Sequence, residues 1–223
     1  MRPLVVAIYS RSGNAVRPWA EAGCECLCVD TAHSIRAGDA GRVEPVGERG
    51  GFLRFVWGDA RSWTPPAGRR PLFVAVESPC TDLTVSGARD FNRKGLALLC
   101  DGLELFNAGY VVASWSAAPF YAENPVGVIS SHFRPPDYAF DPCDFAGYAD
   151  EPAAEAYTKR TCLWTGNGFV MPAPRAVVPL GGPNRTLAFS PGPERQALRS
   201  ATPSGFARAV FLANRPAAWA IAA

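Results

Sequence analysis

Short apolar runs alternate with segments of helical periodicity along the first two thirds of the chain. Four runs have strand length and are nearly continuous in apolar side chains, which is typical of parallel strands buried on both faces: residues 4–9, 24–29, 52–57 and 72–76. Helical spacing with little proline covers residues 15–23, which end at a suitable C-terminal glycine, and residues 88–113, with Cys100 and Phe106 on the core face. This order predicts an α/β fold.

The pattern weakens towards the C-terminus. Residues 120–122 and 161–164 are short enough and apolar enough for strands, whereas residues 38–51 are rich in Gly, Arg and Glu and predict an exposed loop. A final helix is expected from Thr202, with Thr202 as its N-cap and proline in its first turn. The predicted organisation is a cofactor-binding and catalytic α/β domain (1–164), a short irregular insertion (165–201) and a C-terminal helix packed back on the domain (202–223).

Composition and charge place few limits on function. The chain has 223 residues, 48% hydrophobic and 19% charged, which suits one globular core. Its formal net charge of +2 does not indicate a nucleic-acid binder, so any contact with DNA requires a local basic face. No apolar run approaches the roughly 20 residues of a membrane span, and the chain starts with a core-like strand rather than a signal sequence, so no membrane partner and a cytoplasmic location are expected.

The seven cysteines do not have the spacing of a metal site. Cys24, Cys26 and Cys28 alternate along a predicted strand, and we interpret them as reduced thiols of the core. No metal is expected.

The N-terminal elements form a pattern known from nucleotide-binding folds. A strand is followed by a turn of mostly small residues (10–14), a helix, and a second strand that ends at Asp30. Such a turn lets the backbone approach a ligand, and the acid can accept hydrogen bonds from ribose hydroxyls. The sequence therefore predicts a doubly wound, Rossmann-like sheet with helices on both faces.

Two motifs place reactive groups at the ends of predicted strands. Glu77-Ser78-Pro79-Cys80-Thr81 puts a thiol directly after the run 72–76, and Tyr121-Ala122-Glu123-Asn124-Pro125 puts a carboxyl after a second run. Ligand sites of open α/β sheets lie outside the carboxyl ends of the strands. A thiol and an acid there are the pair needed to attack an electron-poor ring while protonating one of its nitrogens. A buried structural thiol is the alternative for Cys80, and a cap or turn residue for Glu123.

These motifs resemble those of one enzyme family. Pro79-Cys80 is similar to the Pro-Cys nucleophile motif of DNA cytosine-C5 methyltransferases, and Glu123-Asn124-Pro125 is similar to their Glu-Asn-Val motif, in the same order. The longer strings 80–89 and 123–127 resemble small phage- and prophage-type members. The resemblance implies transfer of a methyl group from S-adenosylmethionine to C5 of a flipped cytosine in DNA, inside a bacterial or phage-infected cell. Cys80 would add to C6 and Glu123 would donate a proton to N3.

The resemblance also implies the binding residues. Those expected at the cofactor are Tyr9, Ser10, Arg11, Ser12, Gly13, Asp30, Asp59 and Pro79. Those expected at the substrate are Ser86, Arg89, Asn124, His132, Arg134 and Arg160.

Three departures from the family pattern leave alternatives open. Arg11 stands where the family has a small residue, so a carboxyl-bearing analogue is an alternative donor. The run 158–161 replaces the family's Gln-x-Arg-x-Arg, and only residues 165–201 are left for target recognition. Very short sites, single strands or free cytosine nucleotides are therefore alternative substrates. A degenerate fold that binds DNA or a partner is a further alternative, although Cys80 and Glu123 argue against it.

Overall fold

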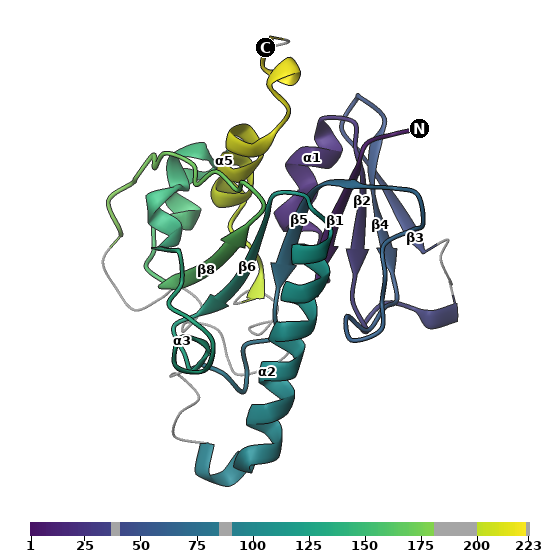
Figure 1. Ribbon diagram of the computed structural model, residues 1–223. Helices are drawn as coiled ribbons and strands as arrows, with labels where there is room; N and C mark the ends of the chain where they lie inside the picture. The colour runs from purple at the N-terminus through teal and green to yellow at the C-terminus, as the bar shows by residue number, and fades with distance from the viewer. Residues whose placement is uncertain (37–40, 85–90, 181–199, 222–223) are drawn as a thin grey trace.

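The computed structural model describes residues 1–36, 41–84, 91–180 and 200–221 (Figure 1). These residues form an eight-stranded sheet with the order β3-β4-β2-β1-β5-β6-β8-β7. The strands β4, β2, β1, β5 and β6 are parallel, β3 is antiparallel to β4, and β8 is antiparallel to both β6 and β7. Their bounds are Leu4–Ile8 (β1), Glu25–Val29 (β2), Arg42–Val46 (β3), Gly51–Val56 (β4), Pro71–Glu77 (β5), Phe120–Pro125 (β6), Tyr138–Phe140 (β7) and Thr161–Gly166 (β8).

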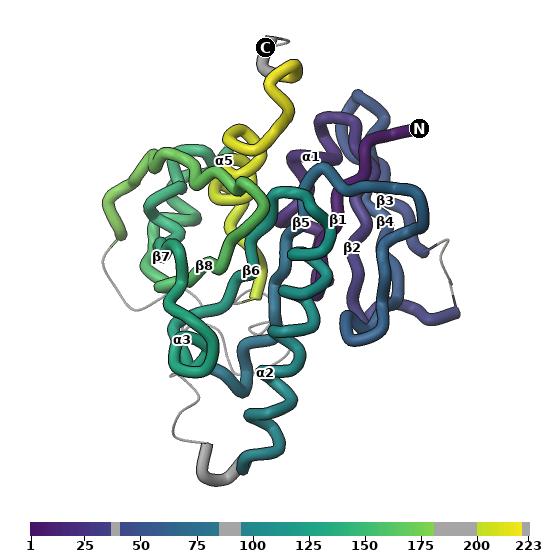
Figure 2. The backbone as a smooth tube through the Cα atoms, in the orientation of Figure 1, coloured from purple at the N-terminus to yellow at the C-terminus, as the bar shows by residue number. Residues whose placement is uncertain are grey.

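Helices cover both faces of this sheet (Figures 1 and 2). One face packs against α1 (Arg17–Glu21) and α5 (Ser204–Asn214), and the other against α2 (Phe91–Trp115). The short helices are η1 (Asn14–Val16), α3 (Ile129–His132), η4 (Pro142–Asp144), η5 (Ala146–Tyr148), η6 (Pro152–Glu155) and η8 (Ala217–Ile221). The α/β class is confirmed, and the mostly parallel sheet is compatible with a Rossmann-like fold.

Aromatic side chains form much of the core on each face. On the α1 and α5 face, Trp19 stacks on Phe73 with ring centroids 5.2 Å apart. On the α2 face, the ring of Phe106 meets the ring of Trp164 edge-on at 5.2 Å. Residues alternate between the two faces along β1 and β5 and are nearly all buried, as the continuous apolar runs predict.

The expected loop at 38–51 is wrong in part, because it contains the strand β3. This strand lies at the edge of the sheet and forms a hairpin with β4, and both Gly47 and Gly50 of the turn adopt positive φ. Val43 of β3 is 45% exposed and Pro45 is exposed. An edge strand tolerates proline and needs few buried apolar side chains, so its sequence does not show the pattern of a core strand.

The long crossover helix is confirmed as α2, with two corrections. Gly95 has non-helical dihedral angles, which interrupt the helix after its first turn, and the core face differs from the expected one. Phe106 is buried against the sheet, as expected, whereas Cys100 is exposed. The first half of α2 projects beyond the end of the sheet (Figure 1), so its side chains have no sheet to pack on. Leu96, for example, is 73% exposed.

The expectation that no segment has the length and composition of a membrane span is also corrected. The stretch Gly95–Trp115 of α2 meets both criteria, with a mean hydropathy of 1.4. One such helix is weak evidence for a membrane span, because the core helix of a soluble protein and a signal sequence meet the same criteria. On its inner face α2 contacts β5 and β6.

The C-terminal helix α5 packs against α1 and η5. The predicted N-cap at Thr202 is wrong, because the N-cap residue of α5 is Pro203. The carboxylate of Glu155 caps the helix instead, accepting hydrogen bonds from the backbone N–H of Ser204 at 2.6 Å and of Gly205 at 2.9 Å. Residues 167–180 contain neither helix nor strand, and the rest of the predicted insertion, 181–199, lies outside the described residues.

Candidate active site

The loops that follow β5 and β6 are joined directly to each other. The strands are parallel neighbours, with Glu77 opposite Glu123. Beyond them, the buried side-chain amide of Asn124 donates to the carbonyl of Ser78 at 3.2 Å. The N–H of Val128 donates to the carbonyl of Leu83 at 2.9 Å, and residues 84 and 127 form an isolated bridge. The Pro-Cys loop and the Glu-Asn-Pro loop therefore form one unit at the carboxyl edge of the sheet.

Cys80 is half-exposed in the first of these loops, and the preceding Pro79 is exposed. The carbonyl of Cys80 accepts backbone hydrogen bonds from Leu83 and Thr84, which fold the loop into a turn. Five of the other cysteines are buried: Cys24, Cys26, Cys28, Cys143 and Cys162. Burial raises the pKa of the Cys24 thiol to about 12, so core thiols of this kind stay protonated. Cys80 is thus the accessible thiol that lies at a strand end.

Glu123 is partly exposed near the end of β6, directly opposite Glu77 of β5. Desolvation by the surrounding protein raises the pKa of its carboxyl, and the charge of Lys159 lowers it in part. A raised pKa keeps more of this carboxyl protonated near neutral pH, which suits a proton donor.

Two further charged groups at this edge were missed by sequence reasoning. Desolvation raises the pKa of Glu77 to about 7, the charge of Glu123 adds to that rise, and a hydrogen bond from the hydroxyl of Thr202 opposes it. The positive charge of Lys159 lowers the pKa of both carboxyls in part. The signal for Glu77 was an acid at the last position of a buried strand, and the signal for Lys159 was the basic run 158–161.

Buried polar atoms without a partner gather at the same edge. Ser78 Oγ, the Tyr121 hydroxyl and Asn124 Oδ1 have no hydrogen-bond partner among the described residues. The buried Ser10 hydroxyl faces Glu77 without meeting hydrogen-bond geometry. Buried polar groups are nearly always paired in proteins, so these atoms are available to form hydrogen bonds with a polar ligand or an ordered water.

The turn after β1 is tightly folded. Tyr9 adopts a positive φ of 62°, and its hydroxyl donates to the carbonyl of Leu105 in α2 at 2.6 Å. Gly13 also has a positive φ, and a Cβ there would lie 2.8 Å from a methyl carbon of Leu53. Between them, Ser10 is buried, while Arg11 and Ser12 are exposed. The backbone and Arg11, rather than the Tyr9 ring, are therefore the parts of this turn available to a ligand.

The two acids expected at a cofactor differ in their surroundings. Asp30 directly follows β2 and is partly exposed, with one oxygen accepting from the N–H of Ala32 at 2.7 Å. Asp59 follows β4, and the guanidinium of Arg61 binds both of its oxygens, at 3.0 and 2.7 Å. This pairing holds the pKa of Asp59 below its usual range. Asp30 is thus open to a ligand on one side, whereas Asp59 is already occupied by a cation.

The residues expected at the substrate do not all meet at this site. Asn124 belongs to it, and Ser86 and Arg89 lie outside the described residues. Arg134 pairs with Asp137 at 2.7 Å, and Arg160 pairs with Asp141 at 3.3 Å.

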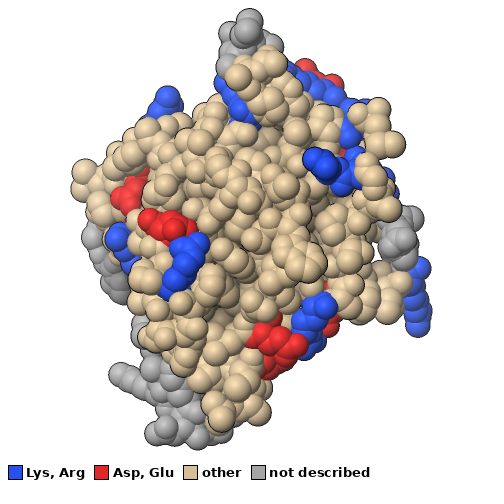
Figure 3. All heavy atoms as spheres, viewed as in Figure 1, with Lys and Arg blue, Asp and Glu red and all other residues tan. Residues whose placement is uncertain are grey.

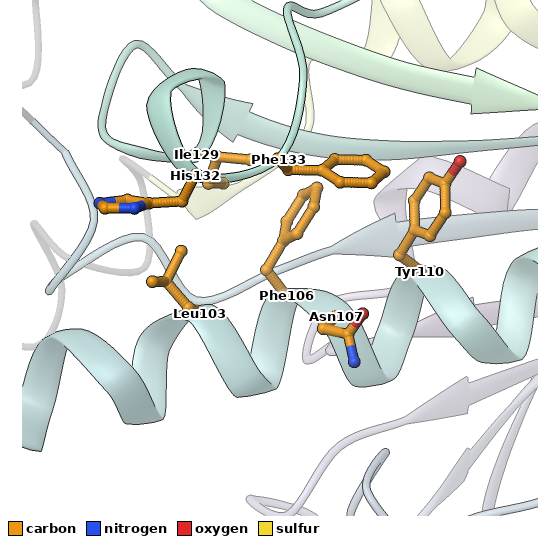
Figure 4. Close-up of a pocket in the computed structure, with 7 residues that line it drawn as sticks. All are labelled: Leu103, Phe106, Asn107, Tyr110, Ile129, His132 and Phe133. Atoms are coloured by element: carbon orange, nitrogen blue, oxygen red, sulfur yellow. The ribbon is translucent and has the colours of Figure 1, made fainter.

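His132 is exposed and lines an apolar pocket between α2 and α3, of about 190 Å³. Figure 4 shows the rings of Phe106, Phe133 and Tyr110 gathered at one end of this pocket and the imidazole of His132 at the other. The pocket lies on the α2 side of the sheet and is separate from the two carboxyls, whose strand neighbours belong to the α1 and α5 face.

The surface shown in Figure 3 is mostly uncharged. On this face Lys and Arg side chains occur in small groups, several of which adjoin Asp or Glu. Among the described residues no group of three or more His, Cys, Asp or Glu side chains is arranged to hold a metal ion.

The chain matches no protein-family model, and a search of curated proteins gives no significant relative.

Proposed function

We propose that the chain transfers a methyl group from S-adenosylmethionine to C5 of cytosine in DNA, with Cys80 as nucleophile and Glu123 as general acid. The observation that carries this proposal is the joined pair of loops at the carboxyl ends of β5 and β6. One loop presents a half-exposed thiol, and the adjacent strand ends in a carboxyl of raised pKa. This is the pair that addition to a cytosine ring requires.

The mostly parallel sheet, with helices on both faces, is compatible with the doubly wound fold that the proposal requires. Five parallel strands form the centre of the sheet, and antiparallel strands lie towards both edges, with β8 between β6 and β7. Cys80 follows β5 and Glu123 lies near the end of β6, and these two strands are parallel neighbours.

At the carboxyl edge of the sheet, the residues present are suited to bind most parts of S-adenosylmethionine. The turn after β1 offers backbone groups, Asp30 has an oxygen available for ribose hydroxyls, and the unpaired Ser10 hydroxyl faces Glu77. At the adenine end the fit is weaker, because Arg61 occupies Asp59. When bound, S-adenosylmethionine supplies an electrophilic methyl group.

The proposed chemistry uses the two side chains in sequence. The thiolate of Cys80 adds to C6 of the ring, and Glu123 donates its proton to N3, so that C5 becomes nucleophilic and takes the methyl group. The proton on C5 is then lost to water, the bond between Cys80 and C6 breaks, and the proton on N3 returns to Glu123. The hydrogen bond from Asn124 to the Ser78 carbonyl holds the cysteine loop against the acid during these steps.

A ring in a duplex cannot reach a thiol and a carboxyl in a crevice, so the cytosine must leave the base stack or come from a single strand. The described part of the chain contains no separate domain for reading a sequence, and the expected insertion is short. We therefore propose short recognition sites or single-stranded DNA as substrate.

A second candidate donor is favoured by one observation. Arg11 is exposed in the turn after β1, and its side chain makes no ion pair with a carboxylate of the described residues. A guanidinium in this turn would pair with an added carboxylate on a modified donor. The same two catalytic side chains would then transfer a carboxyl-bearing alkyl group.

Mass spectrometry of nucleosides tests the proposal and separates the two donors. DNA is isolated from cells without other cytosine modification that express the wild type or Cys80→Ala. The wild type is expected to yield deoxycytidine heavier by one methyl group, and Cys80→Ala unmodified deoxycytidine. A carboxyl-bearing group on cytosine would assign the second donor. Unmodified cytosine in both samples, with the folded protein present, would contradict the proposal.

A further inference from the structure

His33 has no part in the chemistry described so far, yet its side chain contacts the turn that the proposed donor would meet. The residue is half-buried and lies shortly after β2, in the loop that starts at Asp30. Its Nε2 lies 3.0 Å from the backbone carbonyl oxygen of Ser10, in the turn after β1. Its ring meets the ring of Phe55 edge-on, with centroids 5.3 Å apart. The imidazole therefore connects the two loops that contact a bound nucleotide in doubly wound folds.

The chemistry of this contact fixes which ring nitrogen carries the proton. A backbone carbonyl oxygen only accepts hydrogen bonds, so Nε2 of His33 must be the donor. In a neutral imidazole the other nitrogen, Nδ1, is then without a proton. The N–H of Ser10 donates in turn to the carbonyl of Val29, the last residue of β2, at 3.1 Å. Ser10 is thus bound to the β2 side of the site through both its N–H and its carbonyl.

The loop that carries His33 is itself tightly folded. The N–H of His33 donates to the carbonyl of Asp30 at 3.2 Å, and the N–H of Ala32 donates to the carboxylate of Asp30 at 2.7 Å. The N–H of Asp30 donates to the carbonyl of Val56, the last residue of β4, at 3.2 Å. Because the loop is already ordered, the hydrogen bond to Ser10 is formed at a small cost in conformational entropy.

The contact with His33 determines what the turn presents to a ligand. The Ser10 carbonyl and the N–H of Arg11 belong to one planar trans peptide unit, so they point in opposite directions. With the carbonyl directed at His33, the N–H of Arg11 is directed away from it. In the described part of the chain no backbone carbonyl accepts from this N–H. If the peptide unit rotated by half a turn, it would present a carbonyl oxygen in place of a donor, and that oxygen would repel an anion.

We propose that His33 is a positioning residue of the donor site, which holds the peptide unit between Ser10 and Arg11 so that the N–H of Arg11 is available to the carboxylate of the bound donor. The binding of S-adenosylmethionine at this turn rests on the proposed function, whereas the hold on the peptide unit does not. S-Adenosylmethionine carries a carboxylate on its methionine part, and a backbone N–H forms a charge-assisted hydrogen bond with such an anion. In this role His33 touches no reacting atom, so it affects the binding of the donor and not the chemical step.

Two substitutions separate the hydrogen bond of His33 from the packing of its ring. His33→Phe keeps an aromatic ring beside Phe55 and has no N–H, whereas His33→Gln loses the ring and keeps an amide N–H that can reach the Ser10 carbonyl. The full chain is titrated with S-adenosylmethionine in a calorimeter, without DNA. The dissociation constant is expected to be about fivefold higher in His33→Phe, which is equivalent to one ordinary hydrogen bond. His33→Gln is expected to bind as the wild type does.

Ser116→Ala is the matched control. The hydroxyl of Ser116 donates to the carbonyl of Ala113 at 2.6 Å, just before β6 and so at the opposite edge of the sheet. This variant also loses a side-chain hydrogen bond to the backbone, but its donor affinity should not change. An unchanged affinity in His33→Phe, or an equal loss in His33→Gln or in Ser116→Ala, would overturn the proposal. In turnover with DNA, the loss in His33→Phe should appear in the KM for the donor, with kcat unchanged.

Nitrogen-15 NMR of the histidine rings tests the hold on the peptide unit without any donor. The chain has two histidines, so the signals of His33 are identified by their loss in His33→Gln. If that variant does not fold, His132→Gln removes the other set instead, since His132 is exposed. At a pH where the ring is neutral, we expect the proton on Nε2 and none on Nδ1.

The two measurements separate the failure of this inference from the failure of the proposed function. A proton on Nδ1 of His33 in place of Nε2 would overturn the inference, because the Ser10 carbonyl would then lack its donor. If the wild type binds no S-adenosylmethionine, the proposed function fails, and the ring tautomer still decides whether His33 holds the turn.

Discussion

Gly127 lies where the backbones of the cysteine loop and the acid loop approach each other closely, and its replacement by alanine should separate the two loops. A Cβ at this position would overlap the carbonyl oxygen of Leu83 and lie 2.9 Å from the carbonyl carbon of the same residue. Real Cβ atoms do not come closer than 3.0 Å, and the obstacle is backbone rather than a flexible side chain. The two loops would have to move apart by about 1 Å, a displacement that typically costs about 10²-fold in rate.

The effect on stability should be modest by comparison. The separation would break the hydrogen bond from Val128 to Leu83, worth about 1 kcal/mol. The variant should therefore stay folded. We expect methyl transfer to DNA, measured as initial rate with labelled donor at saturating concentrations, to fall about 10²-fold or more in Gly127→Ala.

Gly68→Ala is the matched control. Gly68 precedes β5 at the opposite edge of the sheet, has a φ of 73°, and has nothing within 4 Å of an added Cβ. Alanine there is strained by about 1–2 kcal/mol, at least as much as the expected loss at Gly127, but moves no catalytic loop. A wild-type rate in Gly127→Ala, or an equal loss of rate in both variants, would refute the argument that the joined loops set the geometry of catalysis.

Three further predictions follow from individual side chains. Glu123→Gln keeps the shape of the acid and removes its proton, so the rate should fall about 10²-fold or more with donor affinity by calorimetry unchanged; a collapse of donor binding would place Glu123 at the donor instead. Glu77 has a folded pKa of about 7 against an ordinary 4.5, so the unfolded state loses this proton first, and the free energy of unfolding in urea should fall as pH rises from 4.5 to 7. That fall should be smaller in Glu77→Gln, and an identical pH dependence would contradict the raised pKa. Arg11→Gly should shift the preference between a carboxyl-bearing donor and S-adenosylmethionine towards the latter, measured by competition with the product identified by mass; an equal ratio in both proteins would remove Arg11 from the account.

The central strands and the two loops could be predicted because burial dictates their sequence. Strands such as β1 and β5 are covered on both faces, so nearly every residue is apolar and the first polar residues after them mark the carboxyl edge. The exposed edge strand β3 is under no such restriction, and its sequence resembles a loop.

The details of the candidate site depended on tertiary contacts that local patterns do not contain. In the basic run before β8, the charge of Lys159 lowers the pKa of Glu77 and Glu123, whereas Arg160 pairs with Asp141. The sequence of the run does not show which of its two cations faces which carboxylate. The role of Thr202 depended on Glu155, 49 residues from the helix terminus that it caps. Glu77 lies opposite Glu123 only through the adjacency of β5 and β6.

Trapping with 5-fluorocytosine tests the central claim most directly. Fluorine on C5 cannot leave as a proton does, so the enzyme should remain covalently attached to C6 after the alkyl transfer. Wild-type protein is incubated with donor and DNA containing 5-fluorocytosine, and the adduct is located by peptide mapping. We predict a donor-dependent adduct on Cys80 that is absent in Cys80→Ala. An adduct on Cys24 or Cys143, or no adduct while cytosine is being modified, would contradict the account.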